Sequence, residues 1–273
     1  MRLGIFTKVF PRPTLEETLD AVIAHGLHYV QFNMECSGLP PLPDEITADS
    51  IERIWAGMGS RGIVMAAVSG TYNMIHPDPG ERAAGLRRLR VLASACKGMG
   101  TSIITLCTGT RDAHDQWRWH PENASAQAWQ DLLSEMESAL QIAEETNVTL
   151  AFEPERANVV DSAAKGRALL DAMRSARLKV VIDAANLIDP HEPEKMRQTL
   201  DEAFDLLGEH IVLAHAKDRA PDDSFRAAGD GILVYAHYLQ LLQSIKFQGP
   251  LILHSLTETQ VDQALAFLRD FEI

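Results

Sequence analysis

Short apolar segments alternate with longer amphipathic segments along the whole chain. Eight such pairs divide the 273 residues into units of about 34 residues each. The apolar segments are nearly continuous in hydrophobicity, as expected for parallel strands that are buried on both faces. This alternation predicts one α/β domain, a single (β/α)8 TIM barrel over residues 1–273. An open doubly wound sheet is the alternative, but no glycine-rich dinucleotide-binding motif follows the first strand.

Four successive apolar segments in the second half of the chain end in a side chain that can bind a metal. These residues are Glu153, Asp183, His215 and His254. The carboxyl ends of barrel strands meet on one face, so we expect the four side chains to converge there. Two carboxylates and two imidazoles suit a divalent transition metal. For each acid taken alone, a helix cap or a loop hydrogen bond is the simpler explanation.

Composition restricts the class of partner. With 25 basic and 38 acidic residues the formal charge is −13, which disfavours binding to a nucleic-acid backbone. No apolar segment approaches the roughly 18 residues of a membrane span, and the chain begins on a strand-like segment without a signal-peptide pattern. Three irregularly spaced cysteines favour a reducing compartment. We therefore expect a cytoplasmic protein with neither nucleic-acid nor membrane partners.

Several short motifs, in order and at the predicted strand ends, resemble one family. The chain is similar to the xylose isomerase-like TIM barrels of sugar-phosphate isomerases and epimerases. That superfamily includes tagatose and psicose 3-epimerases, inosose isomerases and dehydratases, hydroxypyruvate isomerase and endonuclease IV. The motifs are residues 70–78 (GTYNMIHPD) with Arg82, 150–154 (LAFEP), 181–186 (VIDAAN), 215–218 (HAKD), 229–231 (GDG) and 249–253 (GPLIL).

The resemblance implies a ligand set for one divalent metal ion. The family binds its metal with Glu, Asp, His and Glu from strands five to eight, which correspond here to Glu153, Asp183, His215 and His254. A histidine replaces the second glutamate, and such a shell favours Mn, Fe, Co or Zn over Mg. Glu153 is then the expected catalytic base. His254 is either a fourth ligand or, if free of metal, a second acid/base.

The resemblance also suggests residues that contact a small carbohydrate substrate. Glu155 and Arg156 could bind substrate or form a local surface pair, and Arg226 could bind an anionic group or be a surface arginine. Trp117 and Trp119 could form a lid over the mouth or a contact in a homo-oligomer. The full set of expected substrate-binding residues is Tyr72, Trp117, Glu155, Arg156, Asn186, Lys217 and Arg226.

The function implied is a metal-dependent isomerase or epimerase of a small sugar, keto-sugar or polyol derivative. A carboxylate would remove a proton beside a metal-polarised carbonyl. A dehydratase of the inosose type begins with the same proton abstraction, so it remains open. A degenerate, non-catalytic sugar-binding barrel also remains open because of His254. DNA repair is disfavoured, since Asn33, Tyr72 and Leu106 do not supply extra histidines at earlier strand ends.

Overall fold

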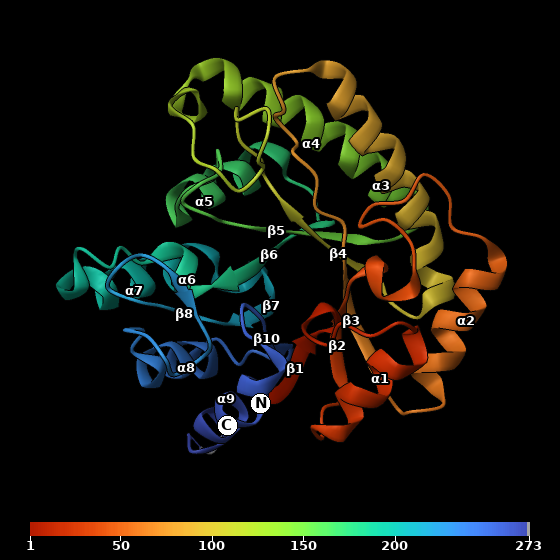
Figure 1. Ribbon diagram of the computed structural model, residues 1–273. Coiled ribbons are helices and arrows are strands. Elements are labelled where there is room, and N and C mark those ends of the chain that lie inside the picture. Colours follow the sequence, from red (N-terminus) through yellow and green to blue (C-terminus); the bar gives the residue numbers. More distant parts are fainter. Residues whose placement is uncertain (272–273) are drawn as a thin grey trace.

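The computed structural model describes residues 1–271 and shows a closed barrel of parallel strands wrapped by helices (Figure 1). Around the barrel, the strands are ordered β1, β2, β3, β4, β5, β6, β7 and β10, and β10 closes the ring by pairing with β1. Their bounds are β1 Arg2–Phe6, β2 Tyr29–Phe32, β3 Val64–Ser69, β4 Ile103–Cys107, β5 Thr149–Glu153, β6 Leu178–Asp183, β7 Ile211–Ala216 and β10 Pro250–Leu253. The predicted single (β/α)8 barrel is confirmed.

Helices in the connections between the strands form the outer layer, and α9 follows the last strand. They are α1 Leu15–Ala24, α2 Ala48–Gly59, α3 Pro79–Met99, α4 Ala126–Thr146, α5 Ala163–Met173, α6 Ala184–Leu187, α7 Met196–Leu207, α8 Tyr235–Ser244 and α9 Val261–Arg269. Short 3₁₀ turns cover η1 Thr7–Val9, η2 Met34–Ser37, η3 Pro121–Ala124, η4 Pro193–Lys195, η5 Gly208–His210 and η6 Glu258–Gln260. In the part of the chain that the structure describes, no helix combines the length and the hydrophobicity that crossing a membrane requires.

Local sequence signals set the ends of the helices. Thr14 forms a capping box with Glu17 at the start of α1, and Ser125 caps α4. Gly100 and Asn147 adopt left-handed backbone conformations that end α3 and α4. Local backbone conformations also limit two later helices. Arg174 turns left-handed after α5, and residues 258–260 form a 3₁₀ turn before α9.

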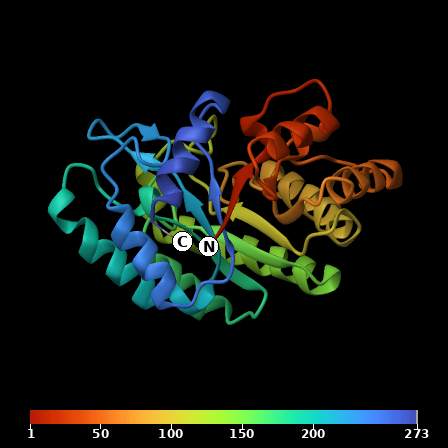
Figure 2. The same ribbon diagram turned by 90° about the horizontal axis from the view of Figure 1, so that it is seen from below.

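A small hairpin lies beyond the carboxyl end of β7. Its strands are β8 Asp218–Arg219 and β9 Phe225–Arg226, which pair antiparallel. The side view in Figure 2 places this light-blue hairpin at the same end of the barrel as the tip of β1. The Asp218 carboxylate anchors the hairpin by accepting backbone hydrogen bonds from Arg219, Gly229 and Leu233 at 2.8, 3.2 and 2.9 Å.

The glycines of the Gly229–Gly231 motif allow the backbone to approach the Asp218 carboxylate. Gly229 has a φ of +92°, which favours glycine, and a Cβ on Gly231 would lie 2.3 Å from an Asp218 carboxylate oxygen. Asp218 therefore fixes the loop after β7.

Candidate active site

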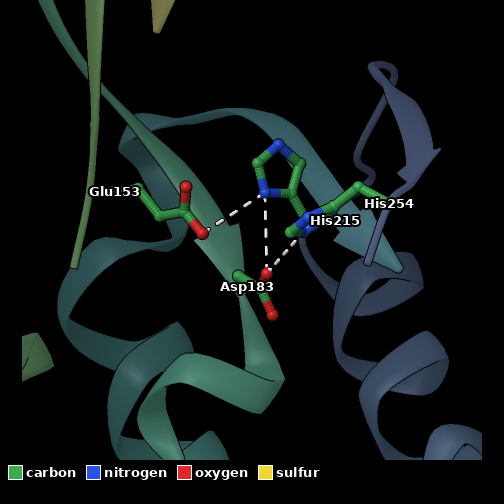
Figure 3. A group of neighbouring side chains, drawn as sticks. All are labelled: Glu153, Asp183, His215 and His254. Atoms are coloured by element: carbon green, nitrogen blue, oxygen red, sulfur yellow. Dashed lines mark hydrogen bonds and ion pairs between the residues drawn. The ribbon is translucent and has the colours of Figure 1, made fainter. Parts of the chain in front are cut away.

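Four side chains from the carboxyl ends of neighbouring strands meet at the mouth of the barrel. Glu153 ends β5, Asp183 ends β6, His215 lies on β7 and His254 directly follows β10. One ligand atom from each lies within 4.8 Å of the other three, and Figure 3 shows the side chains pointing toward a common centre. Strand register explains this convergence, because Asp183 pairs with His215 and His215 pairs with Ile252, two residues before His254.

Asp183 lies at the centre of the group. Its Oδ2 is 3.0 Å from His254 Nε2 and 3.6 Å from His215 Nδ1 (Figure 3). Its Oδ1 accepts a hydrogen bond from the backbone N–H of Ala185 at 3.0 Å, capping the short helix α6. One carboxylate thus does both things that the sequence offered as alternatives: one oxygen caps a helix and the other faces the histidines.

Both histidines are oriented by hydrogen bonds on their outer nitrogens. His215 Nε2 lies 2.9 Å from Gln31 Oε1, and the Gln31 amide nitrogen donates to Ser69 Oγ and Thr105 Oγ1 at 3.0 and 2.9 Å. Because the amide nitrogen is engaged in this way, Gln31 presents its oxygen to His215. His215 therefore carries a proton on Nε2, and Nδ1 faces the carboxylates.

His254 is oriented in a comparable way. Its Nδ1 lies 3.1 Å from Ser255 Oγ, which leaves Nε2 toward Asp183, and its ring stacks on Phe6 at a centroid distance of 4.7 Å. Ser255 itself has a φ of +57°, a strained conformation for a residue other than glycine.

The two histidines titrate in opposite directions. Burial opposes the charged form of His215, but the negative charges of Glu153 and Asp183 outweigh it and raise the pKa to about 9. Burial, together with the charge on His215, lowers the pKa of His254 to about 4. The pKa of Asp183 falls well below its usual value, because the charge of Lys217 and hydrogen bonds from both histidines outweigh the effect of burial. A neutral His254 therefore sits beside a charged His215 at neutral pH.

Lys217 and Asn186 complete a chain of contacts around the carboxylates. The Lys217 ammonium lies 3.3 Å from Asp183 Oδ2 and donates to Asn186 Oδ1. The Asn186 amide donates to Glu153 Oε1 at 2.6 Å. Glu153 Oε1 is thus occupied by Asn186 and His215, whereas no hydrogen bond from residues 1–271 reaches Glu153 Oε2. The free oxygen of Glu153 is the one available to a substrate.

A cavity of about 240 Å³ opens above these residues. Of the residues that the sequence predicted for the site, it is lined by Trp117, Glu153, Glu155, Asn186, Lys217 and His254. Burial raises the pKa of Glu155 to about 7, although the charge of Lys217 opposes this shift. Because Trp117, Glu155, Asn186 and Lys217 all line it, the cavity contains most of the expected substrate-contacting residues.

Tyr72 lies elsewhere. Its hydroxyl donates a hydrogen bond to Glu135 of α4 at 2.9 Å, and its ring packs beside Gly85 of α3. The loop after β3 turns toward the helices, and Asn73 and His76 bond to the backbone of the loop after β4. The expectation that Tyr72 reaches the mouth is wrong, because its side chain points into the helix layer.

Arg156 and Arg226 also lie outside the mouth cavity. Arg156 bridges Asp189 and Asp223, each at 3.3 Å, and ties the loop after β5 to its neighbours. Arg226 is exposed and lies 3.7 Å from Asp222. Successive side chains on a strand point in opposite directions, so Phe225 faces the cavity and Arg226 does not. Arg226 is therefore a surface arginine, the second of the two alternatives that the sequence left open.

The first half of the barrel contributes residues that the sequence did not single out. They line the cavity from the tips of strands β1 to β4 and include Phe6, Lys8, Gln31, Asn33, Ser69 and Thr105. A detectable signal existed for two of them, since Gln31 and Thr105 are polar residues inside otherwise apolar strands. A buried polar side chain within a barrel strand needs a partner, and here the partners are each other and His215.

The donor set fits a divalent metal ion. Two carboxylates and two imidazoles converge, and both imidazoles have their outer nitrogens engaged by Gln31 or Ser255. Engagement of the outer nitrogen is how proteins hold histidines that bind metals. A closed parallel barrel with such a cluster at its carboxyl-end mouth defines the class as a TIM barrel with a candidate metal centre.

Comparison with known proteins identifies the family. The sequence profile of the xylose isomerase-like TIM barrel matches residues 19–271, and the chain belongs to that family. No curated protein sequence matches the chain. The match to the family profile confirms the resemblance predicted from the sequence.

Similar solved structures agree with this fold over nearly the whole chain. The 3-keto-D-glucoside 4-epimerase YcjR from E. coli is 16% identical, with a TM-score of 0.74 and 99% of each chain covered. A xylose isomerase domain protein from Planctomyces limnophilus is 17% identical, with a TM-score of 0.77 and coverages of 99% and 96%. The probable 3-DHS dehydratase AsbF from Bacillus anthracis is 13% identical, with a TM-score of 0.76 and coverages of 98% and 99%.

Proposed function

We propose that this protein is a divalent-metal-dependent isomerase or epimerase of a small sugar, keto-sugar or polyol derivative. The observation that carries the proposal is the convergence of Glu153, Asp183, His215 and His254 below the mouth cavity. Structures similar to this chain include sugar epimerases and a probable dehydratase, which is consistent with carbonyl-adjacent proton chemistry.

The four converging residues would hold the metal ion. When bound, the ion would polarise a substrate carbonyl and so acidify the neighbouring C–H group. Two neutral imidazoles and two carboxylates favour Mn, Fe, Co or Zn over Mg. His215 must lose its Nδ1 proton before this nitrogen can act as a ligand, so metal binding and proton release are coupled.

Glu153 is the base in this proposal. Asn186 and His215 hold Oε1, so the carboxylate has a fixed orientation and Oε2 remains available toward the cavity. A positioned carboxylate is a common acceptor for a proton beside a carbonyl. Glu153 can remove a proton from one carbon and return it to the adjacent carbon on the same face of the substrate.

The residue directly after β10 is His254, although two further carboxylates, Glu35 and Glu155, line other parts of the cavity. His254 stands where the family resemblance implies a carboxylate, and an Nε2 that binds metal cannot also accept a proton. Epimerisation at one carbon needs proton removal and delivery on opposite faces, whereas isomerisation can use one base. We therefore favour aldose–ketose isomerisation over epimerisation.

Lys217 favours a dehydratase as the second candidate. Its ammonium lines the cavity and is buried beside Asp183 and Asn186. An ammonium in this position can donate a proton to a departing hydroxyl group after Glu153 has removed the C–H proton. Detection of water loss, as opposed to positional isomers, separates the two functions.

The test begins with metal analysis of freshly purified protein. The protein is then incubated in D2O with a panel of ketoses and inososes, and NMR follows deuterium uptake at the carbon beside the carbonyl. Glu153→Gln should abolish exchange while retaining the fold. The control is Glu209→Gln, an exposed residue in the 3₁₀ turn before β7, and it should behave as the parent does. A parent protein that neither retains metal nor exchanges any substrate proton would leave the non-catalytic sugar-binding barrel as the explanation.

A further inference from the structure

An open groove of about 800 Å³ lies directly beside the mouth cavity. It shares three residues with that cavity, namely Trp117, Glu155 and Phe225. The groove extends from there over Trp119 and the hairpin formed by β8 and β9. The two spaces therefore adjoin, and the shared residues form the boundary between them.

Exposed aromatic side chains are concentrated along this groove. Trp117, Trp119 and Phe225 are 51, 60 and 40% exposed, although each would gain from burial. A contiguous exposed apolar surface with a polar rim marks a binding site in soluble proteins. Aromatic faces pack well against the C–H faces of a sugar ring, and the polar rim can bond its hydroxyl groups.

The loop that carries the tryptophans is held in place from below. Asp115 Oδ1 accepts from the Trp117 backbone N–H at 2.9 Å, and Asn123 donates to the Ala157 carbonyl at 3.0 Å. Asn158 Oδ1 accepts from the Gly109 backbone N–H at 2.9 Å. The backbone is thus fixed while the aromatic side chains stay exposed, as a preorganised binding surface requires.

The polar rim matches the hydroxyl groups of a sugar. Arg156 and Arg219 both pair with Asp223, and all three residues line the groove. Alternating guanidinium donors and carboxylate acceptors can bond both partners of a vicinal diol. The rim carries charges of both signs, so it selects a neutral polyhydroxylated ligand over a strongly charged one.

The volumes of the mouth cavity and the groove suggest a ligand with two sugar rings. Ligand pockets usually occupy about 300–1,000 Å³. The mouth cavity, at about 240 Å³, lies below this range and suits a single small polyol. The groove adds about 800 Å³ immediately outside it. A ligand with one ring above Glu153 and a second ring outside Trp117 would use both.

We propose that the groove is a second sugar-ring subsite and that the substrate is a two-ring glycoside or disaccharide. The reacting ring would occupy the mouth cavity, and the ring linked to it would pack on Trp119 between Trp117 and Phe225. This substrate class rests on the proposed function of the mouth. The subsite itself is a binding property and can be measured whether or not the mouth is catalytic.

The experiment compares one-ring and two-ring ligands by calorimetry. Glucose and methyl β-D-glucoside are titrated against cellobiose and maltose, with the protein either chelator-treated or loaded with Mn²⁺. At least one disaccharide should bind tenfold or more tightly than both one-ring ligands. Trp119→Ala should remove this advantage and leave the affinity for one-ring ligands unchanged. Trp55→Ala is the matched control, because Trp55 lies on α2 and is 59% exposed.

Intrinsic fluorescence supplies a second readout. Cellobiose or maltose should shift the tryptophan emission in the parent and in Trp55→Ala, and the shift should shrink in Trp119→Ala. Equal affinities for one-ring and two-ring ligands would overturn the subsite, as would a disaccharide advantage that survives in Trp119→Ala. An altered oligomeric state in Trp119→Ala with unchanged disaccharide affinity would show instead that the groove contacts a second copy of the chain.

The outcomes for the subsite and for the proposed function are separable. Metal content and deuterium exchange test the mouth and do not depend on Trp119. A disaccharide advantage in chelator-treated protein without metal uptake or exchange would support the subsite and refute the proposed catalysis. Metal-dependent exchange on one-ring ketoses with no disaccharide advantage would support the proposed catalysis and refute the subsite.

Discussion

The two halves of the barrel mouth differ in the chemistry of their strand ends. Strands β5, β6, β7 and β10 supply the titratable residues Glu153, Asp183, His215 and His254. Strands β2, β3 and β4 supply neutral amides and hydroxyls, above all Gln31. The charged half offers the atoms that would bind metal and move protons. The neutral half reaches across the barrel and orients them through one hydrogen bond, Gln31 to His215.

This division has a physical reason. A buried charge is costly unless it is paired, so charges gather where they can compensate one another. Neutral polar groups can support the cluster without altering its net charge. Variants that remove a charge should therefore have larger effects than variants that remove a neutral support.

The largest effect is expected for Asp183→Asn. This change removes a proposed ligand atom and leaves the buried Lys217 without its carboxylate partner at 3.3 Å. Metal affinity should fall by more than about 100-fold, since even the loss of a residue that supports a ligand costs about 10–100-fold. Unfolding free energy should fall by about 3–5 kcal/mol because a buried charge loses its partner. Metal titration and denaturant unfolding measure both, with Asp189→Asn in the loop after β6 as the control. Unchanged metal affinity would remove Asp183 from the ligand set.

The next largest effect is expected from pH. The pKa of His215 is about 9 without metal, so a proton must leave before Nδ1 can coordinate. Apparent metal affinity should rise by up to about tenfold per pH unit from pH 7 to pH 9, and level off above that. Metal titrations in buffers of matched ionic strength measure this slope. A flat profile over this range would show that His215 does not bind through a nitrogen that is protonated without metal.

In the metal-free protein, the pKa shifts of the two histidines predict how the free energy of unfolding depends on pH. Because its folded pKa is raised from 6.5 to about 9, His215 contributes stability that is full below pH 6.5 and lost as pH rises through 9. His254 has a folded pKa lowered from 6.5 to about 4, so its contribution is full above pH 6.5 and lost as pH falls through 4. The two contributions together place the maximum stability near pH 6.5. His254→Phe should flatten the acidic side only.

A smaller effect is expected when the hydrogen bond between Gln31 and His215 is removed. Gln31→Met keeps the volume of the side chain but removes the oxygen that holds His215 Nε2 at 2.9 Å. Metal affinity should fall by about 10–100-fold, with all four ligand residues intact. Ser69→Ala should cost much less, because the Gln31 amide retains Thr105. Equal losses in Gln31→Met and Ser69→Ala would mean that the neutral half acts through general packing.

The smallest of these effects, about tenfold, is expected for His254→Glu. The substitution places a second strong carboxylate base beside Asp183 and restores the ligand pattern that the family resemblance implies. Metal preference should shift toward Mg or Mn, and any exchange activity should change by about tenfold, which corresponds to about 1.4 kcal/mol. Competition between metals followed by elemental analysis measures the shift. If preference and activity both match the parent, His254 is a bystander.

The sequence by itself determined the architecture and half of the site. Continuous apolar strands alternating with amphipathic helices specify a parallel sheet covered by helices on both faces. The lack of a glycine-rich motif after the first strand then favours the closed barrel over the doubly wound sheet. Acids and histidines at consecutive strand ends then predict a common face, since parallel strands present their carboxyl ends together. Glu153, Asp183, His215 and His254 could be proposed in this way before any coordinates were known.

Only the tertiary structure decided which other side chains reach that face. Tyr72 follows β3 as directly as Asn186 follows β6, yet one turns into the helix layer and the other contacts Glu153. The loop backbone makes this choice through long-range contacts such as Tyr72 with Glu135, which leave no local pattern in the sequence. Gln31 and His215 are separated by 184 positions and become partners only when the barrel closes. Closure of the ring brings distant strand tips within hydrogen-bonding distance, and that is why the supporting half of the site is a property of the fold.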